Sequence, residues 1–324
     1  MTHAIRIHAP GGPEVLRWEA IDVGMPAPGE VRLKHTAAGL NYMDVYYRLG
    51  LYPATLPIVP GNEAAGIVEE VGAGVADLKP GDRVAYVTPA VGAYSQARVI
   101  AADQLVRLPD SISDVEGAAM MMRGMTVQYL LRRTYRVAPG DTILVHAAAG
   151  GIGLVMCQWA RHLGATVIGT VSTDEKAELA TAHGCTHTIN YAREDFVQRV
   201  SELTDGRKVA VVYDGVGKDT FSKSLDCLKP MGTLVLFGHA SGKVPPFDLL
   251  TLAGKGSLYV TRPTLWNHIA SRADLVATAN ELIGAVVGGI VKIPVNQSYP
   301  LREAARAHHD LEMRKTTGAT VLTV

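Results

Sequence analysis

Residues 142–153, TILVHAAAGGIG, are the most informative segment of the sequence for the fold. It reads as a short buried strand that runs through a glycine-rich turn into an amphipathic helix. Gly150, Gly151 and Gly153 allow the backbone of such a turn to approach a pyrophosphate and to aim the helix N-terminus at it. The dinucleotide-binding pattern G-x-G-x-x-G is met in part, because Ala148 stands in place of its first glycine. We predict a nucleotide-binding turn here; a turn without a ligand is the alternative.

The residues after this turn alternate between strand and helix patterns. The strand patterns are TVIGTV (166–171), HTIN (187–190), VAVVYDGVG (209–217) and TLVLFG (233–238), and the helical patterns are GLVMCQWARHLG (153–164), DEKAELATAHG (174–184), EDFVQRVSELTDG (194–206) and TFSKSLDCLKPMG (220–232). Strict alternation implies right-handed crossovers. The pattern predicts an α/β fold with a parallel, doubly wound sheet.

The first part of the chain has a different pattern. Short runs rich in β-branched residues alternate with turn signals, as in EVRLKHTAAGL (30–40) and LKPGDRVAYV (78–87). This spacing predicts a small barrel or sandwich, up to a linking helix that RGMTVQYLL (123–131) opens. After about residue 265 the alternation loosens. Helices are expected at 271–286 and 302–312, and a strand in the final GATVLTV.

Composition limits the classes of partner. The chain has 324 residues, 31 basic and 31 acidic, so no net charge attracts nucleic acid or an acidic membrane. It lacks the run of about 18 apolar residues that spans a membrane, and its N-terminus lacks the apolar core of a signal peptide. The three cysteines are odd in number and far apart, which fits a reducing cytoplasm.

Six segments carry a family resemblance. AAGLNYMDVYYRLGLYP, GNEAAGIVEEVGAGV, KPGDRVAY, HAAAGGIG, VVYDGVG and GSLYVTRP together resemble the quinone oxidoreductases, the zeta-crystallin-like, zinc-independent branch of the medium-chain dehydrogenase/reductases. The resemblance implies a GroES-like, mainly-β substrate domain at 1–124, completed by 266–324, and a Rossmann NADPH-binding domain at 125–265. It also implies NADPH-dependent reduction of a quinone in the cleft between the domains.

Two asparagines bear on whether the chain uses a metal. Zinc-dependent relatives of this branch bind the metal through a cysteine, a histidine and a further cysteine or acidic residue. The first two of these positions are Asn41 and Asn62 here, and no cysteine precedes Cys157. Neutral amides are poor ligands for zinc, which prefers thiolate and imidazole. We predict no metal site.

Without a metal, the protein has to orient the nicotinamide and the acceptor and to exclude water. Candidates for catalytic groups lie in NYMDVYYRLGLYP (41–53): the amide of Asn41 on the nicotinamide-ribose side, and the phenols of Tyr46 and Tyr52, which can stack or donate a proton. For the tyrosines, packing at the domain boundary is an equal alternative. Asp44 is interpreted as structural.

The choice of cofactor depends on the end of the second strand of the alternating region. NAD-specific folds place an acidic residue there, about 20 residues past the glycine turn. In VIGTVSTDEK that position is Val171, beside Ser172, and the nearest acid is Asp174. Lys176 supplies a charge for a 2′-phosphate, and Tyr191 reaches the same phosphate. The pattern therefore predicts NADPH.

The resemblance implies further contacts with the cofactor. Together with the residues above, these contacts give the cofactor-binding set Asn41, Arg123, Thr126, Gly150, Gly151, Ile152, Ser172, Lys176, Tyr191, Phe237, Gly238, His239, Val260 and Arg314.

The oligomeric state and two alternative functions can also be considered from the sequence. The resemblance implies a homodimer through an edge strand at 257–261. The motifs do not separate a quinone reductase from an NADPH-dependent alkenal or enoyl reductase. A non-catalytic, crystallin-like protein that binds NADPH or RNA is the other alternative, although the neutral charge disfavours RNA.

Overall fold

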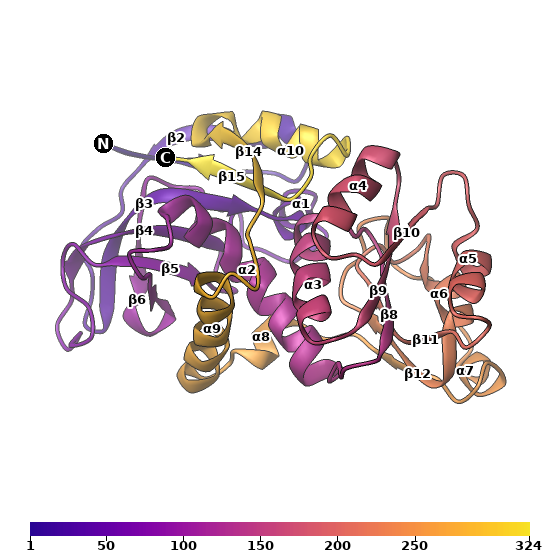
Figure 1. Cartoon of the computed structure of the whole chain (residues 1–324). Helices are drawn as coiled ribbons and strands as arrows, with labels where there is room; N and C mark the ends of the chain where they lie inside the picture. The colour runs from indigo at the N-terminus through magenta and orange to yellow at the C-terminus, as the bar shows by residue number, and fades with distance from the viewer. The chain divides into compact units, whose positions relative to one another are not determined.

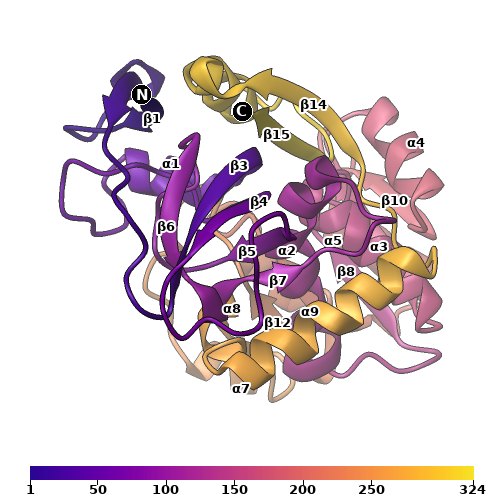
Figure 2. The same ribbon diagram turned by 90° about the vertical axis from the view of Figure 1, so that its left-hand side faces the viewer.

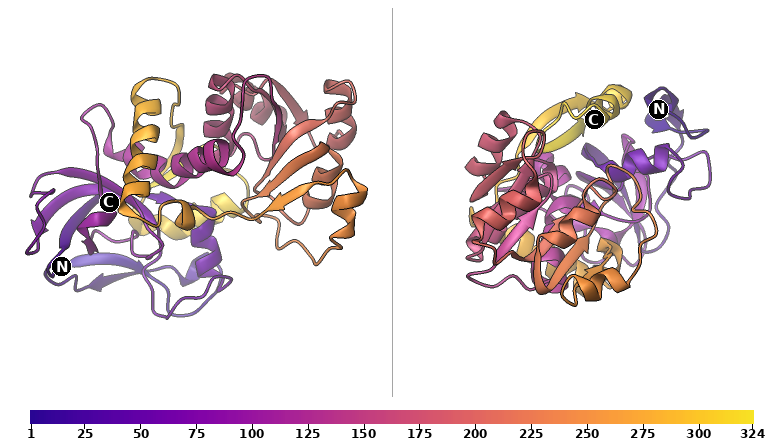
Figure 3. Two further views of the ribbon diagram at one scale, coloured as in Figure 1. Left: turned by 90° about the horizontal axis from the view of Figure 1, so that it is seen from below. Right: turned by 90° about the vertical axis from the view of Figure 1, so that its right-hand side faces the viewer.

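The computed structural model describes the whole chain, residues 1–324. Its contacts divide it into two compact units: a first unit of Met1–Met125, Ile269–Val287 and Ile293–Val324, and a second unit of Thr126–His268 and Gly288–Lys292. Both chain ends lie in the first unit (Figure 3). The sequence-based boundaries differ from this division near the junctions, since Met125 belongs to the first unit and 266–268 and Gly288–Lys292 belong to the second.

The second unit is built on a six-stranded parallel sheet in the order β10-β9-β8-β11-β12-β13. The strands are β8 (Thr142–Val145), β9 (Thr166–Val171), β10 (His187–Asn190), β11 (Val209–Asp214), β12 (Leu228–Leu236) and β13 (Tyr259–Thr261). The chain winds outward from β8 to β10 and then returns to β11 on the other side of β8. This order is that of a doubly wound dinucleotide-binding fold, so the predicted fold class is confirmed.

Helices cover both faces of this sheet. They are α3 (Gly151–His162), α4 (Asp174–Ala182), α5 (Phe196–Leu203), α6 (Phe221–Asp226), α7 (Leu250–Gly254) and α8 (Leu265–His268). In Figure 1, α3 and α4 lie on one face, and α5 and α6 lie on the other. Strand residues such as Leu144, Ile168 and Val212 are completely buried between these layers, as expected for a parallel sheet covered on both sides.

The expected helix at 220–232 was too long. Helix α6 ends at Asp226, and β12 begins at Leu228. The register of β12 on β11 shifts near its start, where Met231 has a left-handed φ of 58°. Pro230 has no N–H to donate to a helix, so the Lys-Pro-Met-Gly segment joins the strand as an irregularity. The edge strand is also shorter than expected, since β13 begins at Tyr259.

The first unit is mainly β, as predicted. Its larger sheet has the order β14-β15-β3-β4-β5-β7, with β6 also paired to β3; these strands are labelled in Figure 2. A two-stranded sheet joins β1 to β2. The strands are β1 (Thr2–Arg6), β2 (Arg17–Ile21), β3 (Glu30–Leu40), β4 (Glu63–Val71), β5 (Arg83–Val87), β6 (Ala97–Ala101), β7 (Val106–Arg107), β14 (Val295–Pro300) and β15 (Ala319–Thr323). Because β15 pairs with β3, the end of the chain completes the sheet.

The helices of the first unit come from distant parts of the sequence. They are α1 (Tyr42–Arg48), α2 (Asp114–Tyr129), α9 (Arg272–Val287) and α10 (Ala304–Glu312), with 3-10 turns at Pro13–Val15, Ala102–Gln104 and Leu301–Glu303. Helix α2 runs across the junction into the second unit and continues as a π-helical turn, Leu130–Thr134. None of the helices combines the length and apolar character needed to span a bilayer.

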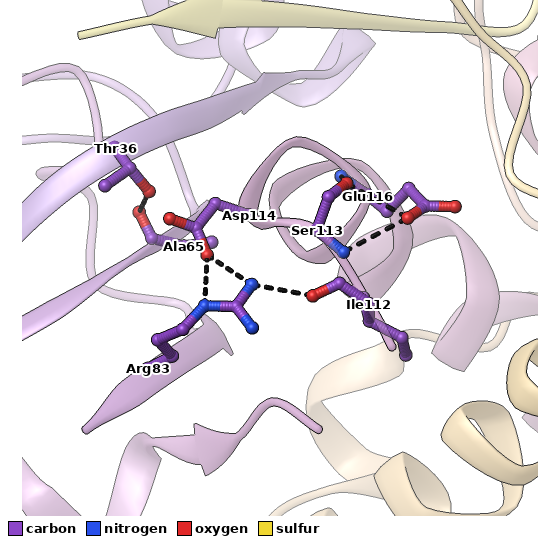
Figure 4. Close-up of polar contacts among 7 residues, drawn as sticks. All are labelled: Thr36, Ala65, Arg83, Ile112, Ser113, Asp114 and Glu116. Atoms are coloured by element: carbon purple, nitrogen blue, oxygen red, sulfur yellow. Dashed lines mark hydrogen bonds and ion pairs between the residues drawn. The ribbon is translucent and has the colours of Figure 1, made fainter. Parts of the chain in front are cut away.

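The expected start of α2 was wrong. Arg123 and Thr126 lie well inside this helix, which begins at Asp114. Figure 4 shows the reason: Ser113 and Glu116 exchange hydrogen bonds in a capping box, and Arg83 of β5 pairs with Asp114 at 2.6 Å. A carboxylate in the first turn also suits the positive end of the helix. The N-terminus of α2 is thus fixed to the sheet.

Candidate active site

The carboxyl edge of the parallel sheet brings several predicted cofactor residues together. The register pairs Val171 of β9 with Asn190 of β10, so Ser172 and Tyr191 leave adjacent strands side by side. The N–H of Tyr191 donates to the carbonyl of Val171 at 3.1 Å. This edge is where doubly wound sheets bind ligands.

The glycine turn has the geometry that nucleotide binding requires. Gly150 is the N-cap of α3, and a Cβ on Gly153 would lie 2.4 Å from the carbonyl oxygen of Ala147. Only glycine therefore allows this helix to start so close to the strand. The left-handed residue of the turn is Ala147, with φ of 54°. The first-turn N–H groups, those of Gly151 and Ile152 among them, have no partner within the helix.

Beyond β9, the acidic residue that follows the strand is already paired. Val171 is buried where an NAD-specific fold would place its acid. The nearest acid, Asp174, accepts from Asn190 Nδ2 at 3.1 Å and forms an ion pair with Arg193. Its carboxylate is therefore held and partly neutralised. Sequence reasoning missed Arg193, which pairs with Asp174 at the start of α4.

The end of β12 supplies another group of predicted cofactor residues. The N–H of Phe237 donates to the backbone carbonyl oxygen of Asp214 at 2.9 Å, and a Cβ on Gly238 would lie 2.6 Å from the carbonyl oxygen of Gly215. Burial and the nearby Arg262 lower the pKa of His239. These residues follow the strand at the same carboxyl edge. Val260 lies within β13, opposite Leu234, and Thr126 is buried on α2.

In the first unit, Asn41 lies between the end of β3 and the start of α1. Its backbone N–H donates to Asp44 Oδ2 at 2.8 Å, and its side-chain Nδ2 donates to Glu63 Oε1 at 2.7 Å. The residue is therefore held by two carboxylates, one near in sequence and one from β4.

Glu63 is the centre of a buried polar cluster. The residue is completely buried, and its Oε2 accepts from the N–H of Met122 at 2.6 Å. Its Oε1 lies 3.3 Å from Arg123 Nη1. Burial raises the pKa of Glu63 and lowers the pKa of Arg123, and each opposes the effect on the other. We consider both groups charged, because each is paired and hydrogen-bonded.

Arg123 is committed largely to this cluster. Its Nη1 also donates to the carbonyl of Ala119 at 2.6 Å, and its Nη2 donates to that of Leu40 at 2.8 Å. The guanidinium therefore ties α2 to the end of β3, next to Asn41. Contact between Arg123 and the cofactor stays a prediction, and would have to use the remaining N–H donors.

A second network of hydrogen bonds leads from Asp44 to Glu312 in α10. Tyr94 donates to Asp44 Oδ2 at 3.0 Å, and its hydroxyl lies 3.2 Å from His308 Nε2. Arg48 Nη1 lies 3.3 Å from His308 Nδ1, and the Arg48 guanidinium makes paired bonds to Glu312 at 2.8 and 2.7 Å. The donor roles fix the tautomer: His308 accepts at Nδ1 and donates from Nε2.

Burial has the largest effect on the pKa values of Asp44 and His308 in this hydrogen-bond network. It raises the pKa of Asp44 to about 7, against the effect of its hydrogen bonds. It lowers the pKa of His308 to about 3, and the charge of Arg48 acts in the same direction. Thus His308 stays neutral, and Asp44 titrates near neutral pH in the folded protein. Asp44, which we interpreted as structural, holds the backbone of Asn41.

The tyrosines of α1 and Tyr52, which follows this helix, form an aromatic cluster, called the α1 cluster below. The ring centroids of Tyr46 and Tyr52 are 5.3 Å apart, and those of Tyr42 and Tyr46 are 5.9 Å apart. Arg314, just past α10, is close enough to Tyr42 to lower its pKa, although burial has the larger, opposite effect. The structure therefore brings Arg314 to the helix that carries Tyr46.

The position of Asn62 is structural in this chain. The residue is completely buried, and its Nδ2 donates to the carbonyl oxygens of Thr88 and Pro89. No group of three or more histidine, cysteine or acidic side chains has the arrangement of a metal site. The absence of a metal remains a prediction from the ligand types at Asn41 and Asn62.

Sequence reasoning missed Glu63, which holds the side chain of Asn41. Glu63 lies in the same GNEAAG segment as Asn62, but only the asparagine was considered. An acidic residue in an otherwise apolar strand pattern was the available signal, because a buried charge needs partners. Arg48, Tyr94 and His308 gave no local signal, since their contacts span up to 264 residues of sequence.

Comparison with known proteins defines the class. Residues 27–110 match the family described as "Alcohol dehydrogenase GroES-like domain", and residues 151–278 match that described as "Zinc-binding dehydrogenase". The chain is thus a two-domain dehydrogenase/reductase of the medium-chain superfamily.

Full-length relatives narrow this class. The chain is 54% identical to "Quinone oxidoreductase" of Pseudomonas aeruginosa, over 99% of both chains. It is 50% identical to "2-haloacrylate reductase" of a Burkholderia species, again over 99% of both. The crystal structure of Escherichia coli quinone oxidoreductase complexed with NADPH superposes with a TM-score of 0.97, at 48% identity and with 100% of both chains covered. The protein belongs to the quinone oxidoreductase family.

Proposed function

We propose that this protein is a zinc-independent, NADPH-dependent quinone reductase. One observation carries the cofactor assignment: the carboxyl edge of β9 has Val171 in place of an acid, with Lys176 and Arg193 nearby. A carboxylate at this position would bond the ribose 2′-hydroxyl of NADH and repel a 2′-phosphate. The full-length likeness to quinone oxidoreductases supports the choice of acceptor.

The residues of the second unit suit NADPH. The N-terminus of α3, with Gly150, Gly151 and Ile152, would take the pyrophosphate, because its N–H groups and helix dipole favour an anion. Ser172, Lys176 and Tyr191 would bind the 2′-phosphate. The remainder of the NADPH site would be lined by Phe237, Gly238, His239 and Val260. When bound, NADPH supplies the hydride for reduction.

The first unit would orient the acceptor. Asn41, Tyr46 and Tyr52 are the groups that we assign to the reaction, and Arg123, Thr126 and Arg314 are further cofactor positions. An electron-poor quinone accepts hydride without a Lewis acid, so the protein has to supply orientation and exclusion of water. The phenols of the α1 cluster suit the flat face of a quinone.

A second acceptor class has specific support. A relative that is 50% identical is named a 2-haloacrylate reductase, which indicates that this scaffold accommodates an activated carbon–carbon double bond. We therefore retain the reduction of activated alkenes as the alternative activity. Both acceptors are electron-poor conjugated systems.

An acceptor panel tests the proposal. NADPH oxidation is followed with 1,4-benzoquinone, phenanthrenequinone, an alkenal and 2-chloroacrylate. We expect the largest kcat/KM with a quinone. Saturable NADPH binding with no turnover of any acceptor would refute the enzyme assignment and favour a crystallin-like role. A preference for the alkenal or the haloacrylate would support the alternative.

We also propose a homodimer through the edge of the parallel sheet. The edge strand β13 has one unpaired side, and Tyr259 is 61% exposed. Leu249 and Leu250 are also exposed nearby, with 71% and 76% of their surface accessible. An unpaired apolar edge is an association site. Light scattering should give a dimer mass, and Tyr259→Asp should give a monomer; a wild-type monomer at micromolar concentration contradicts the proposal.

A cytoplasmic location is proposed from the cysteines. Cys157, Cys185 and Cys227 are buried and unpaired by disulfides, which suits a reducing compartment. Fractionation of cells that produce the protein tests this, and recovery from an oxidising compartment would contradict it.

A further inference from the structure

Asn41 is the predicted catalytic residue with the most defined surroundings. Its side chain meets Glu63 through Nδ2, at 2.7 Å from Oε1. Its backbone meets Asp44 at the start of α1, at 2.8 Å. The carboxamide nitrogen is therefore held by Glu63, while the Asn41 side chain also forms the capping box of α1 with Asp44.

Glu63 has no freedom to move away from this contact. It is completely buried, and the N–H of Met122 and the guanidinium of Arg123 hold its two oxygens from α2. On the other side, a Cβ on Gly39 would lie 2.3 Å from Glu63 Oε1. Only glycine at this position of β3 leaves room for the carboxylate. The oxygen that faces Asn41 is thus held in one place.

The charge of Glu63 determines which way the carboxamide faces. An ionised carboxylate only accepts hydrogen bonds, so the nitrogen of Asn41 has to face Glu63 and its oxygen has to face the other way. A neutral partner would allow the amide to turn over. The Glu63 carboxylate therefore selects one of the two flipped orientations of the Asn41 carboxamide, whose nitrogen and oxygen ends have similar shapes.

We propose that Glu63 is a positioning residue for hydride transfer, which acts on the reaction by holding the Asn41 carboxamide in one orientation. This inference rests on the proposed function, since it takes Asn41 as a group beside the nicotinamide. A misplaced catalytic group can lower a rate by about 100-fold. Loss of the selected orientation should therefore lower kcat, while the NADPH phosphates stay bound.

The test is a double-mutant cycle of Glu63→Gln and Asn41→Ala. Glutamine has the size of glutamate, but its amide must point a donor either at Asn41 or at the N–H of Met122. We expect Glu63→Gln alone to lower kcat with 1,4-benzoquinone by about tenfold to 100-fold, with little change in the Kd of NADPH. In the Asn41→Ala background, Glu63→Gln should have no further effect.

A second readout needs no cofactor. In the NMR spectrum of the cofactor-free protein, the side-chain amide of Asn41 should show one proton shifted downfield by its bond to a carboxylate. Glu63→Gln should remove this shift. Glu116→Gln, the same substitution at the exposed cap of α2, is the matched control and should preserve both kcat and the resonance.

Three results would overturn the inference while wild-type turnover is intact. They are a wild-type kcat in Glu63→Gln, effects of the two substitutions that multiply, and an unchanged Asn41 resonance. If Glu63→Gln does not fold, Glu63→Asp replaces it; this variant keeps the charge beside Arg123 but withdraws it from Asn41, and should lower kcat in the same non-additive way. Wild-type protein that reduces no quinone would instead refute the proposed function.

Discussion

Asn62 donates a hydrogen bond from its side-chain nitrogen to the carbonyl oxygen of Thr88, at 2.9 Å, inside the first unit. Zinc-dependent relatives use this position for a metal-binding histidine, whereas the amide here bonds to the backbone. The group left over is a neutral amide oxygen, which zinc does not favour.

We therefore expect the purified protein to contain no stoichiometric zinc and to keep its activity through prolonged treatment with a strong chelator. Elemental analysis and activity before and after chelation provide the measurement. About one zinc per chain, or activity lost with the chelator and restored by zinc, would contradict this prediction.

Lys176 should discriminate between the two nicotinamide cofactors. A lysine–phosphate contact contributes about 1.5–3 kcal/mol, which is tenfold or more in affinity. Lys176→Ala should weaken NADPH binding by about that factor and leave NADH nearly unchanged, as measured by fluorescence titration. Lys229→Ala, an exposed lysine at the start of β12, is the control. Equal weakening of both cofactors would show that the phosphate pocket is misassigned.

His35 should contribute to the acid sensitivity of the protein. Burial lowers its pKa to about 4, and it lies between the carbonyl of Ser95 and the hydroxyl of Tyr86. Between about pH 6.5 and 4 the unfolded chain binds a proton at this position that the folded chain does not, so stability falls as pH falls. The contribution is complete above about pH 6.5.

The measurement compares urea unfolding of wild type and His35→Gln between about pH 6.5 and 4.5. The slope of the free energy of unfolding against pH should be more positive in wild type than in His35→Gln, by about 1.4 kcal/mol per pH unit. Asp44 has the opposite sign, because its folded pKa is raised to about 7, but it is present in both proteins and cancels. His162→Gln, at an exposed position of α3, should keep the wild-type slope. Equal slopes for wild type and His35→Gln would show that His35 is not buried as a neutral group.

The ion pair between Arg48 and Glu312 should contribute more to the free energy of unfolding than the exposed ion pair between Glu303 and Arg306. The Arg48 side chain is 1% exposed and that of Glu312 is 30% exposed, so Glu312→Gln leaves a buried cation with a weaker partner. We expect a loss of about 2–3 kcal/mol, less than for a fully enclosed pair because Glu312 is partly exposed. Glu303→Gln removes the exposed pair with Arg306 and should cost about 0.5 kcal/mol or less. Equal losses in denaturant unfolding would contradict this ranking.

The sequence predicts local structure well where a pattern repeats at close range. The alternation from Thr142 to Leu236 predicts the parallel sheet, because each strand and helix buries a face against its neighbour. The prediction was wrong for the helix at 220–232, where Pro230 ends the helical pattern. It was also wrong for the start of α2, where the capping box of Ser113 and Glu116 was overlooked. The polar chain from Asp44 to Glu312 could not be predicted, because it depends on how β15 and α10 return to β3.

The candidate site also has a part that the sequence predicts and a part that it does not. The glycine turn, Val171 and Lys176 lie in one strand-helix unit, and sequence reasoning places them at one edge of the sheet. Asn41 could be selected from its motif, but its orientation depends on Glu63 and Arg123 from two other elements. The sequence signals that Glu63 needs partners, but not which residues of other elements provide them.

We propose that the protein transfers hydride from NADPH to a quinone without a metal. The most direct test is stopped-flow oxidation of NADPH by 1,4-benzoquinone in chelator-treated protein, with NADH in parallel. We predict saturable turnover, a kcat/KM at least tenfold higher with NADPH than with NADH, and a slower reaction when the transferred hydrogen of NADPH is deuterium. No turnover after chelation, or a preference for NADH, would contradict the account.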